Sequence, residues 1–239
     1  MILKTEGVSK YFGDLKAVDN VDLEIEEGEI YGMAGPNGAG KTTLFNVISG
    51  LLPPSFGKVI FKNDIISGLK PYQICHKGIA RTFQIPTVFS TLTVLDNIKI
   101  GAVFGAKTKK LDSSHINEII EFLGIQNKKD NIAQNLSLYT IKLIMLAAAL
   151  ATDCKLLLLD EPMAGLTVAE INSFLQTIRK MNKEWGITIM IIEHLIDTLI
   201  DISDRIIILD GGKVIYKGLP EELTKDKKVI EVYLGKGEE

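Results

Sequence analysis

An unbroken run of eight residues has the types and spacing needed to hold a phosphate group: Gly35-Pro36-Asn37-Gly38-Ala39-Gly40-Lys41-Thr42. It matches the pattern G-x-x-x-x-G-K-T, between a strand-like segment that ends near Ala34 and a predicted helix over about 41–48. Glycines let backbone N–H groups curl around phosphate oxygens, and the start of a helix adds partial positive charge. We therefore interpret the run, with Thr43, as a nucleotide-binding loop. Lys41 would reach the β- and γ-phosphates, and the Thr42 hydroxyl would bind Mg²⁺. The alternative is a glycine-rich turn that matches the pattern by chance.

A second pattern is an apolar run that ends in two carboxylates, Leu156-Leu157-Leu158-Leu159-Asp160-Glu161-Pro162. The run reads as a buried strand, and in open α/β sheets ligands gather beyond the carboxyl ends of the strands. A buried strand has little use for carboxylates there unless something cationic lies nearby. We expect Asp160 to hold Mg²⁺ through water and Glu161 to accept a proton from the attacking water. Alternatively, Glu161 only begins a turn before Pro162.

The order of these motifs along nearly the whole chain resembles that of ABC-transporter ATP-binding subunits. The resemblance implies ATP and Mg²⁺ as cofactors and adds three site residues. Phe12, in KYFG, would stack on adenine, although an aromatic residue in a strand can also be a core residue. Gln84, in RTFQ, would sense Mg²⁺ and water. His194, which closes IMIIEH at a strand end, would contact the γ-phosphate.

The family signature LSGGQ is altered in this chain to Leu136-Ser137-Leu138-Tyr139-Thr140. In the family this segment contacts the γ-phosphate held by the other subunit of a head-to-tail dimer. Ser137 is kept, but Leu138 and Tyr139 would place bulk where glycine permits close approach. Ser137 could equally be only a helix N-cap. The loop after Glu161 also lacks the family's aspartate, and its Thr167 forms a capping-box pattern with Glu170.

The altered signature leads us to expect a heterodimer with a second ABC ATPase whose signature is intact. In a homodimer, each ATP would face Leu138 and Tyr139 of the partner copy. Three activities remain open for the chain: an ATPase that powers a transporter, a soluble ABC ATPase without a transport role, and a regulatory subunit with weak hydrolysis. The single cassette without sustained heptads argues against the second, and the intact Glu161 argues against the third.

Composition limits the partners. The chain has 239 residues, 46% of them hydrophobic, and a formal net charge of −3. The two lysine clusters are short and read as solvated loops, so no nucleic-acid partner is expected: Lys107, Lys109 and Lys110, and Lys225, Lys227 and Lys228. The two cysteines lack metal or redox spacing, which suits a reducing compartment. The longest apolar run, 143–151, is too short to span a bilayer.

The expected fold is α/β, a P-loop NTPase core of the ABC ATPase type with an N-terminal antiparallel β subdomain and a helical insertion. Strand-like segments alternate with helical ones, which indicates a parallel sheet buried on both faces. We expect one ABC domain over 1–239, with the core in 1–92 and 152–239 and the helical subdomain in 93–151. A helix over 168–183 and hairpins around Asn63-Asp64 and Asp210-Gly211-Gly212 are further expectations.

Within the family, RTFQ, the shortened helical region and the ending PEELTKDKKVIEVYLG are most similar to ATPases of branched-chain amino-acid importers. Urea importers and lipopolysaccharide exporters are the alternatives. The resemblance implies permease subunits as partners, a solute-binding protein in the full system, and a peripheral position on the cytoplasmic face of the cell membrane.

Overall fold

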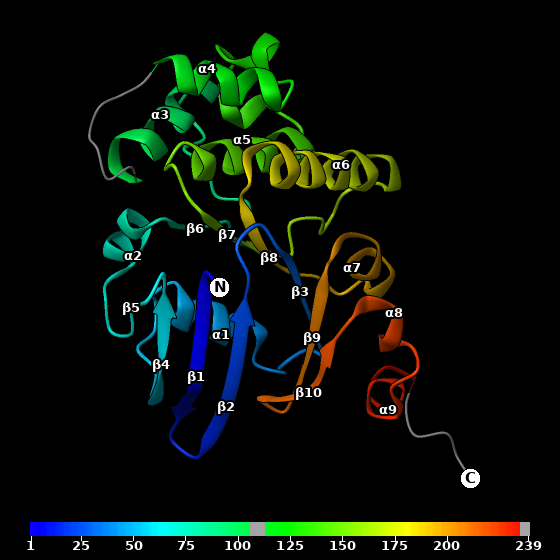
Figure 1. The fold of residues 1–239 in the computed structure, drawn as a ribbon. Coiled ribbons are helices and arrows are strands. Elements are labelled where there is room, and N and C mark those ends of the chain that lie inside the picture. Colours follow the sequence, from blue (N-terminus) through cyan, green and yellow to red (C-terminus); the bar gives the residue numbers. More distant parts are fainter. Residues whose placement is uncertain (106–112, 235–239) are drawn as a thin grey trace.

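The computed structural model describes residues 1–105 and 113–234 and contains two sheets with helices around them (Figure 1). Lys107, Lys109 and Lys110 lie outside the described residues. The larger sheet has the order β10-β9-β3-β8-β7-β6, and the smaller has the order β2-β1-β4-β5. The predicted combination of a largely parallel core sheet with an N-terminal antiparallel sheet is confirmed.

The antiparallel sheet is built from β1 (Leu3–Phe12), β2 (Leu15–Ile25), β4 (Phe56–Phe61) and β5 (Asp64–Ile65). The hairpin between β4 and β5 was predicted around Asn63-Asp64. Its turn residues are Lys62 and Asn63, both with positive φ, and Asp64 already pairs with Phe61. The prediction was therefore one residue too late.

The larger sheet carries the strands that lead into the predicted motifs. These strands are β3 (Ile30–Ala34), β6 (Ile79–Arg81), β7 (Leu156–Asp160), β8 (Thr188–Ile192), β9 (Arg205–Asp210) and β10 (Lys213–Gly218). All neighbouring pairs are parallel except β9 with β10. The carboxyl ends of β3, β8, β7 and β6 therefore lie side by side at one edge.

Alternate residues of the buried strands enter two separate cores. Leu156 and Leu158 face the core that the larger sheet shares with α1 (Lys41–Ile48) and the antiparallel sheet. Leu157 and Leu159 face the other core, on the opposite side of the sheet. Burial on both faces explains why this strand is an unbroken apolar run rather than an alternating one.

Helices α3 (Val94–Gly105), α4 (Ser113–Phe122) and α5 (Leu138–Leu150) gather at one end of the molecule, beside α6 (Val168–Trp185) (Figure 1). One face of α4 is buried through Ile116, Ile119 and Ile120. The capping box of Thr167 with Glu170 at the start of α6 is confirmed. Within the described residues, each helix falls short of the length and apolarity needed to cross a bilayer.

The described residues contain four further helices and two 3₁₀ turns: α2 (Pro71–Lys77), η1 (Gln126–Lys128), η2 (Ala133–Asn135), α7 (Ile196–Ile202), α8 (Pro220–Leu223) and α9 (Lys227–Leu234). Helix α2 and the three-residue strand β6 have too few residues to show a periodic pattern.

Candidate nucleotide site

The glycine-rich loop joins β3 to α1 at the carboxyl edge of the larger sheet. Gly40 has φ 101°, and a Cβ atom there would lie 2.2 Å from the Ala17 carbonyl oxygen, so the loop can close against the β1–β2 hairpin only with glycine. Lys41 is buried and donates hydrogen bonds to the carbonyls of Gly35 and Pro36 at 2.7 and 3.0 Å. Burial lowers the pKa of Lys41, while the carboxylates of Glu161 and Asp160 oppose that shift.

A cavity of about 530 Å³ opens in front of this loop and gathers most of the predicted site residues. Its lining includes Phe12, Asn37, Gly38, Ala39, Gly40, Lys41, Thr42, Thr43, Gln84, Glu161 and His194. Gly35 and Pro36 lie at the start of the loop, outside this lining. The sequence analysis did not select Leu15, Lys16, Ala17 and Gly211, which line the cavity from two hairpins. No motif marks those positions, because only the packing of the hairpins against the loop places them there.

Glu161 is the centre of a hydrogen-bond network. Its carboxylate accepts from Gln84 Nε2 at 2.5 Å and lies 2.8 Å from His194 Nε2. A carboxylate only accepts, so the Nε2 atom of His194 carries the proton in this bond. Glu161 has φ 48°, a strained left-handed conformation for a residue other than glycine, and such strain is concentrated at functional sites. Three residues from three separate strand ends therefore converge in front of the phosphate loop.

Phe12 is 48% exposed and lines the cavity mouth. The alternative that it is a core residue is therefore wrong. Lys10 Nζ lies 5.3 Å from the centre of its ring, so the ring already contacts a cation. One face of a purine could pack against a ring placed here.

Asp160 lies behind the cavity rather than in its lining. Its carboxylate forms a buried salt bridge with Arg81 at 2.7 Å. Burial raises the pKa of Asp160, and the neighbouring Glu161 adds to this, whereas Arg81 lowers it. Arg81 was not among the predicted residues. Its position in RTFQ, three residues before Gln84, was the available signal.

Ser137 lies apart from this cavity, at the start of α5. It caps the helix, because its hydroxyl accepts from the Thr140 backbone N–H at 3.3 Å. The half-buried ring of Tyr139 packs edge-on against Phe174 of its own chain. Leu138 is 36% exposed. Of the side chains at the two altered glycine positions, Leu138 is thus the more exposed.

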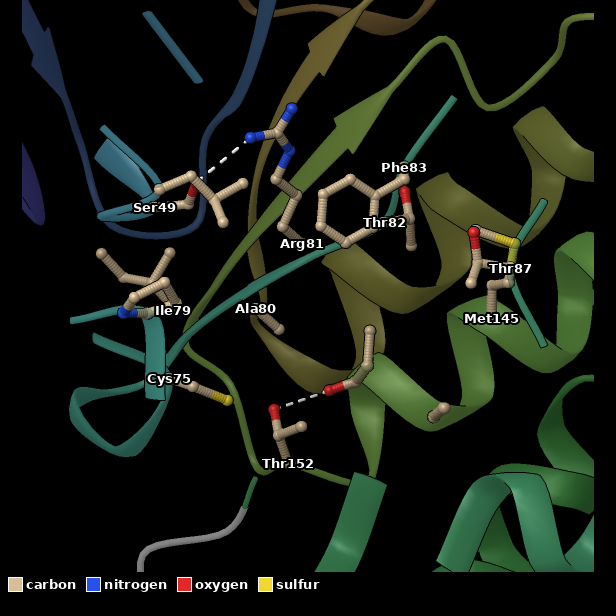
Figure 2. A pocket seen from close by; sticks show the side chains of 14 residues that line it. Ser49, Cys75, Ile79, Ala80, Arg81, Thr82, Phe83, Thr87, Met145 and Thr152 are labelled. Atoms are coloured by element: carbon tan, nitrogen blue, oxygen red, sulfur yellow. Dashed lines mark hydrogen bonds between the residues drawn. The ribbon is translucent and has the colours of Figure 1, made fainter. Parts of the chain in front are cut away.

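A second cavity, of about 340 Å³, is lined by residues of β6, among them Arg81, and of α5 (Figure 2). Apolar side chains form most of its lining, among them Ile79, Phe83 and Met145. Arg81, which forms the salt bridge with Asp160, is also part of this lining.

Comparison with known proteins agrees with this geometry. Residues 18–164 match the family model described as ABC transporter. The chain is 37% identical, over 98% of its length and 95% of the relative's, to the probable branched-chain amino acid transport ATP-binding protein LivG of Archaeoglobus fulgidus. It is 34% identical to an ATP-binding cassette of an ABC transporter solved in its ADP conformation, with a TM-score of 0.89 and coverage of 98% and 99%.

A dimeric bacterial ABC transporter cassette is also similar, with 26% identity, a TM-score of 0.81 and coverage of 92% of this chain and 99% of that one. The family match covers more than half of the chain, and the relatives align over nearly all of it. The protein is an ATPase of the ABC transporter family, an ATP-binding cassette.

Proposed function

We propose that this cassette hydrolyses ATP to power the import of branched-chain amino acids, or of a similar small solute, through a membrane permease. The convergence of Gln84 and His194 on Glu161, in the cavity that also holds Lys41, carries the catalytic part of the proposal. The similarity to LivG carries the transport part.

In this proposal, the residues of the site have separate roles. Phe12 stacks on adenine, and the loop from Gly35 to Thr43 holds the phosphates with its backbone N–H groups. Lys41 exchanges its two carbonyl contacts for phosphate oxygens. Glu161 accepts a proton from the attacking water, while Gln84 and His194 fix the orientation of its carboxylate.

Mg²⁺ fits the donors in this site. Oδ1 of Asp160 is buried and has no hydrogen-bond partner among the described residues, which is unusual for a buried polar atom. Gln84 uses its Nε2 on Glu161 and keeps its carbonyl oxygen for another partner. With the Thr42 hydroxyl, these are the oxygen ligands, direct or through water, that Mg²⁺ prefers. The ion would neutralise charge that develops on the phosphate oxygens.

The partners follow from the position of Ser137. It lies outside its own chain's nucleotide cavity, so the signature could act only on ATP held by another cassette. We propose that a second, different ABC ATPase supplies the opposing signature, and that permease subunits hold the pair on the cytoplasmic face of the membrane. A solute-binding protein would select the cargo.

Two substitutions test the catalytic proposal. Lys41→Ala should weaken ATP binding because it removes the phosphate cation. Glu161→Gln should keep binding while phosphate release falls at least about 100-fold, the usual contribution of a general base. Binding titrations and phosphate-release assays measure both. Unchanged turnover in Glu161→Gln would remove Glu161 from the general-base role.

Affinity purification of the tagged chain from membranes of its own cells tests the transport proposal. Recovery of membrane-spanning subunits and a second ATPase is the expected result. Recovery only in the membrane-free fraction, without these subunits, would favour the soluble ABC ATPase instead.

A further inference from the structure

Arg81 and Asp160 form a buried ion pair directly behind the nucleotide cavity. The guanidinium Nη2 donates to Oδ2 of Asp160 at 2.7 Å, and the two side chains are only 6% and 3% exposed. They are the last residues of the neighbouring parallel strands β6 and β7. Arg81 is therefore placed by the sheet and not by a flexible loop.

The other terminal nitrogen of the guanidinium, Nη1, is bound to α1, the helix that begins at Lys41, and to its C-cap residue, whereas Nε has no hydrogen-bond partner among the described residues. Nη1 of Arg81 donates to Oδ1 of Asn46 at 2.7 Å and to Oγ of Ser49 at 3.1 Å. The guanidinium carbon also lies 5.6 and 5.0 Å from the ring centres of Phe45 and Phe83. Figure 2 shows the bond to Ser49 and the ring of Phe83 beside the arginine. These contacts hold the planar fork in one orientation.

This arrangement leaves one oxygen of Asp160 for a ligand. Oδ2 is occupied by Arg81, whereas Oδ1 is buried and without a partner among the described residues. A buried acceptor is normally satisfied. The missing partner is expected on the nucleotide side, because Asp160 directly precedes Glu161, which lines the nucleotide cavity.

We propose that Arg81 is a positioning residue for Mg²⁺: its fork fixes the Asp160 carboxylate against α1, so that Oδ1 faces the metal and its water. The inference rests on the proposed function, because it requires Mg²⁺ and nucleotide in the cavity. Arg81 touches neither. It fixes the position of the Asp160 carboxylate relative to α1, the helix whose first residues, Lys41 and Thr42, hold the phosphates.

A purely structural role for Arg81 makes a different prediction. If the guanidinium only neutralises a buried carboxylate, its replacement lowers stability without changing the metal requirement. If it orients the carboxylate, its replacement raises the Mg²⁺ requirement even when the protein stays folded. Arg81→Lys separates the two roles, because lysine keeps the charge but cannot hold Asp160, Asn46 and Ser49 in one plane.

The test uses the full chain with ADP, which avoids turnover. We would titrate Mg²⁺ and follow ADP affinity by calorimetry, and record the electron paramagnetic resonance spectrum of bound Mn²⁺. Arg81→Lys should raise the half-saturating Mg²⁺ concentration about 10-fold, the scale seen for partners of metal ligands, and broaden the Mn²⁺ signal. Its ADP affinity in EDTA should stay within about twofold of the parent, because the phosphate loop is unchanged.

Two further variants make the result decisive. Asn46→Ala keeps the ion pair but removes one anchor, and should shift the Mg²⁺ requirement in the same direction, by about threefold; it serves if Arg81→Lys does not fold. Arg205→Lys is the matched control, since Arg205 pairs with Glu29 at the opposite edge of the sheet and packs against Tyr31. It should leave the requirement unchanged.

An unchanged Mg²⁺ requirement in Arg81→Lys and Asn46→Ala, or an equal shift in Arg205→Lys, would overturn the inference. Failure of the parent protein to bind Mg²⁺ and ADP would instead overturn the proposed function. The two failures are thus distinguishable.

Discussion

At the scale of single residues, the ring of Phe12 can be tested for a role in ATP binding separately from a role in folding. Because Phe12 is 48% exposed at the cavity mouth, Phe12→Ala should weaken ATP binding by about 1 kcal/mol through lost stacking. The melting temperature of the nucleotide-free protein should barely change. Binding titration and thermal denaturation measure the two effects.

Phe56→Ala is the matched control for Phe12. Phe56 is 63% exposed on the same antiparallel sheet and packs against Tyr11, outside the cavity lining. It should leave ATP affinity unchanged. Equal loss of affinity in both variants would mean that the sheet, and not the ring of Phe12, determines binding.

Glu193 makes the stability of the fold depend on pH. Its side chain is buried and accepts a hydrogen bond from the Met163 backbone N–H at 2.9 Å. Burial raises the pKa of Glu193 to about 7, while the Met163 hydrogen bond opposes the shift and Glu161 adds to it. The folded protein therefore binds this proton more tightly than the unfolded chain does.

The sign of the effect follows from linkage. Stability from protonated Glu193 is fully present below about pH 4.5, the pKa of an ordinary glutamate, and is lost as pH rises through about 7. Glutamine cannot ionise, so the free energy of unfolding of Glu193→Gln should lack the decrease of about 3 kcal/mol that the parent shows across this window. Urea unfolding at a series of pH values measures it. Parallel pH profiles for parent and variant would contradict the assignment.

At the scale of elements, the altered signature forms the start of α5, and its neighbouring residues Leu138 and Tyr139 make different contacts. Leu138 lies against the loop after Glu161, since a Cβ atom on Gly165 would lie 3.0 Å from its Cδ2 atom. Tyr139 instead points into the chain and packs on Phe174 of α6. We therefore expect Leu138, more than Tyr139, to obstruct an approaching nucleotide.

This difference predicts different outcomes for two glycine substitutions. Tyr139→Gly should lower the free energy of unfolding by about 2 kcal/mol or more, because it removes ring packing and adds glycine to a helix. Leu138→Gly should cost about 1 kcal/mol and increase ATP-dependent association in a Glu161→Gln background. Chemical denaturation and light scattering measure both. Stronger association from Tyr139→Gly than from Leu138→Gly would refute the assignment.

At the scale of the whole molecule, Ser137 lies outside the nucleotide cavity of its own chain, so the proposed pairing would be needed to bring a signature to that site. Paired with an intact-signature ATPase, this cassette would contribute one competent site and one weak site. Purified alone, it should bind ATP, hydrolyse it slowly and remain largely monomeric, because a homodimer would place Leu138 opposite both nucleotides.

Light scattering of Glu161→Gln with saturating ATP tests this prediction. A monomeric mass is the expected result, and addition of the partner ATPase should produce a dimer. The double variant Leu138→Gly with Glu161→Gln is the positive control for homodimer formation. A stable ATP-dependent homodimer of Glu161→Gln alone would contradict the heterodimer.

The sequence alone determined the phosphate loop, the strand that ends at Asp160 and Glu161, and the capped start of α6. These features are local: a glycine-rich loop between a strand and a helix, an apolar run buried on both faces, and a capping box are each written in consecutive residues. The same holds for α1, which was predicted with its observed bounds, Lys41–Ile48.

Only the tertiary structure decided which side chains meet. Arg81 and Asp160 are 79 residues apart in the chain, and the adjacency of β6 and β7 brings them together. The ring of Tyr139 packs against Phe174 because α6 lies beside α5. The hairpin residues Lys16 and Gly211 line the cavity because the two sheets pack around α1. No local pattern records such contacts, since they depend on strand order and helix packing over long separations.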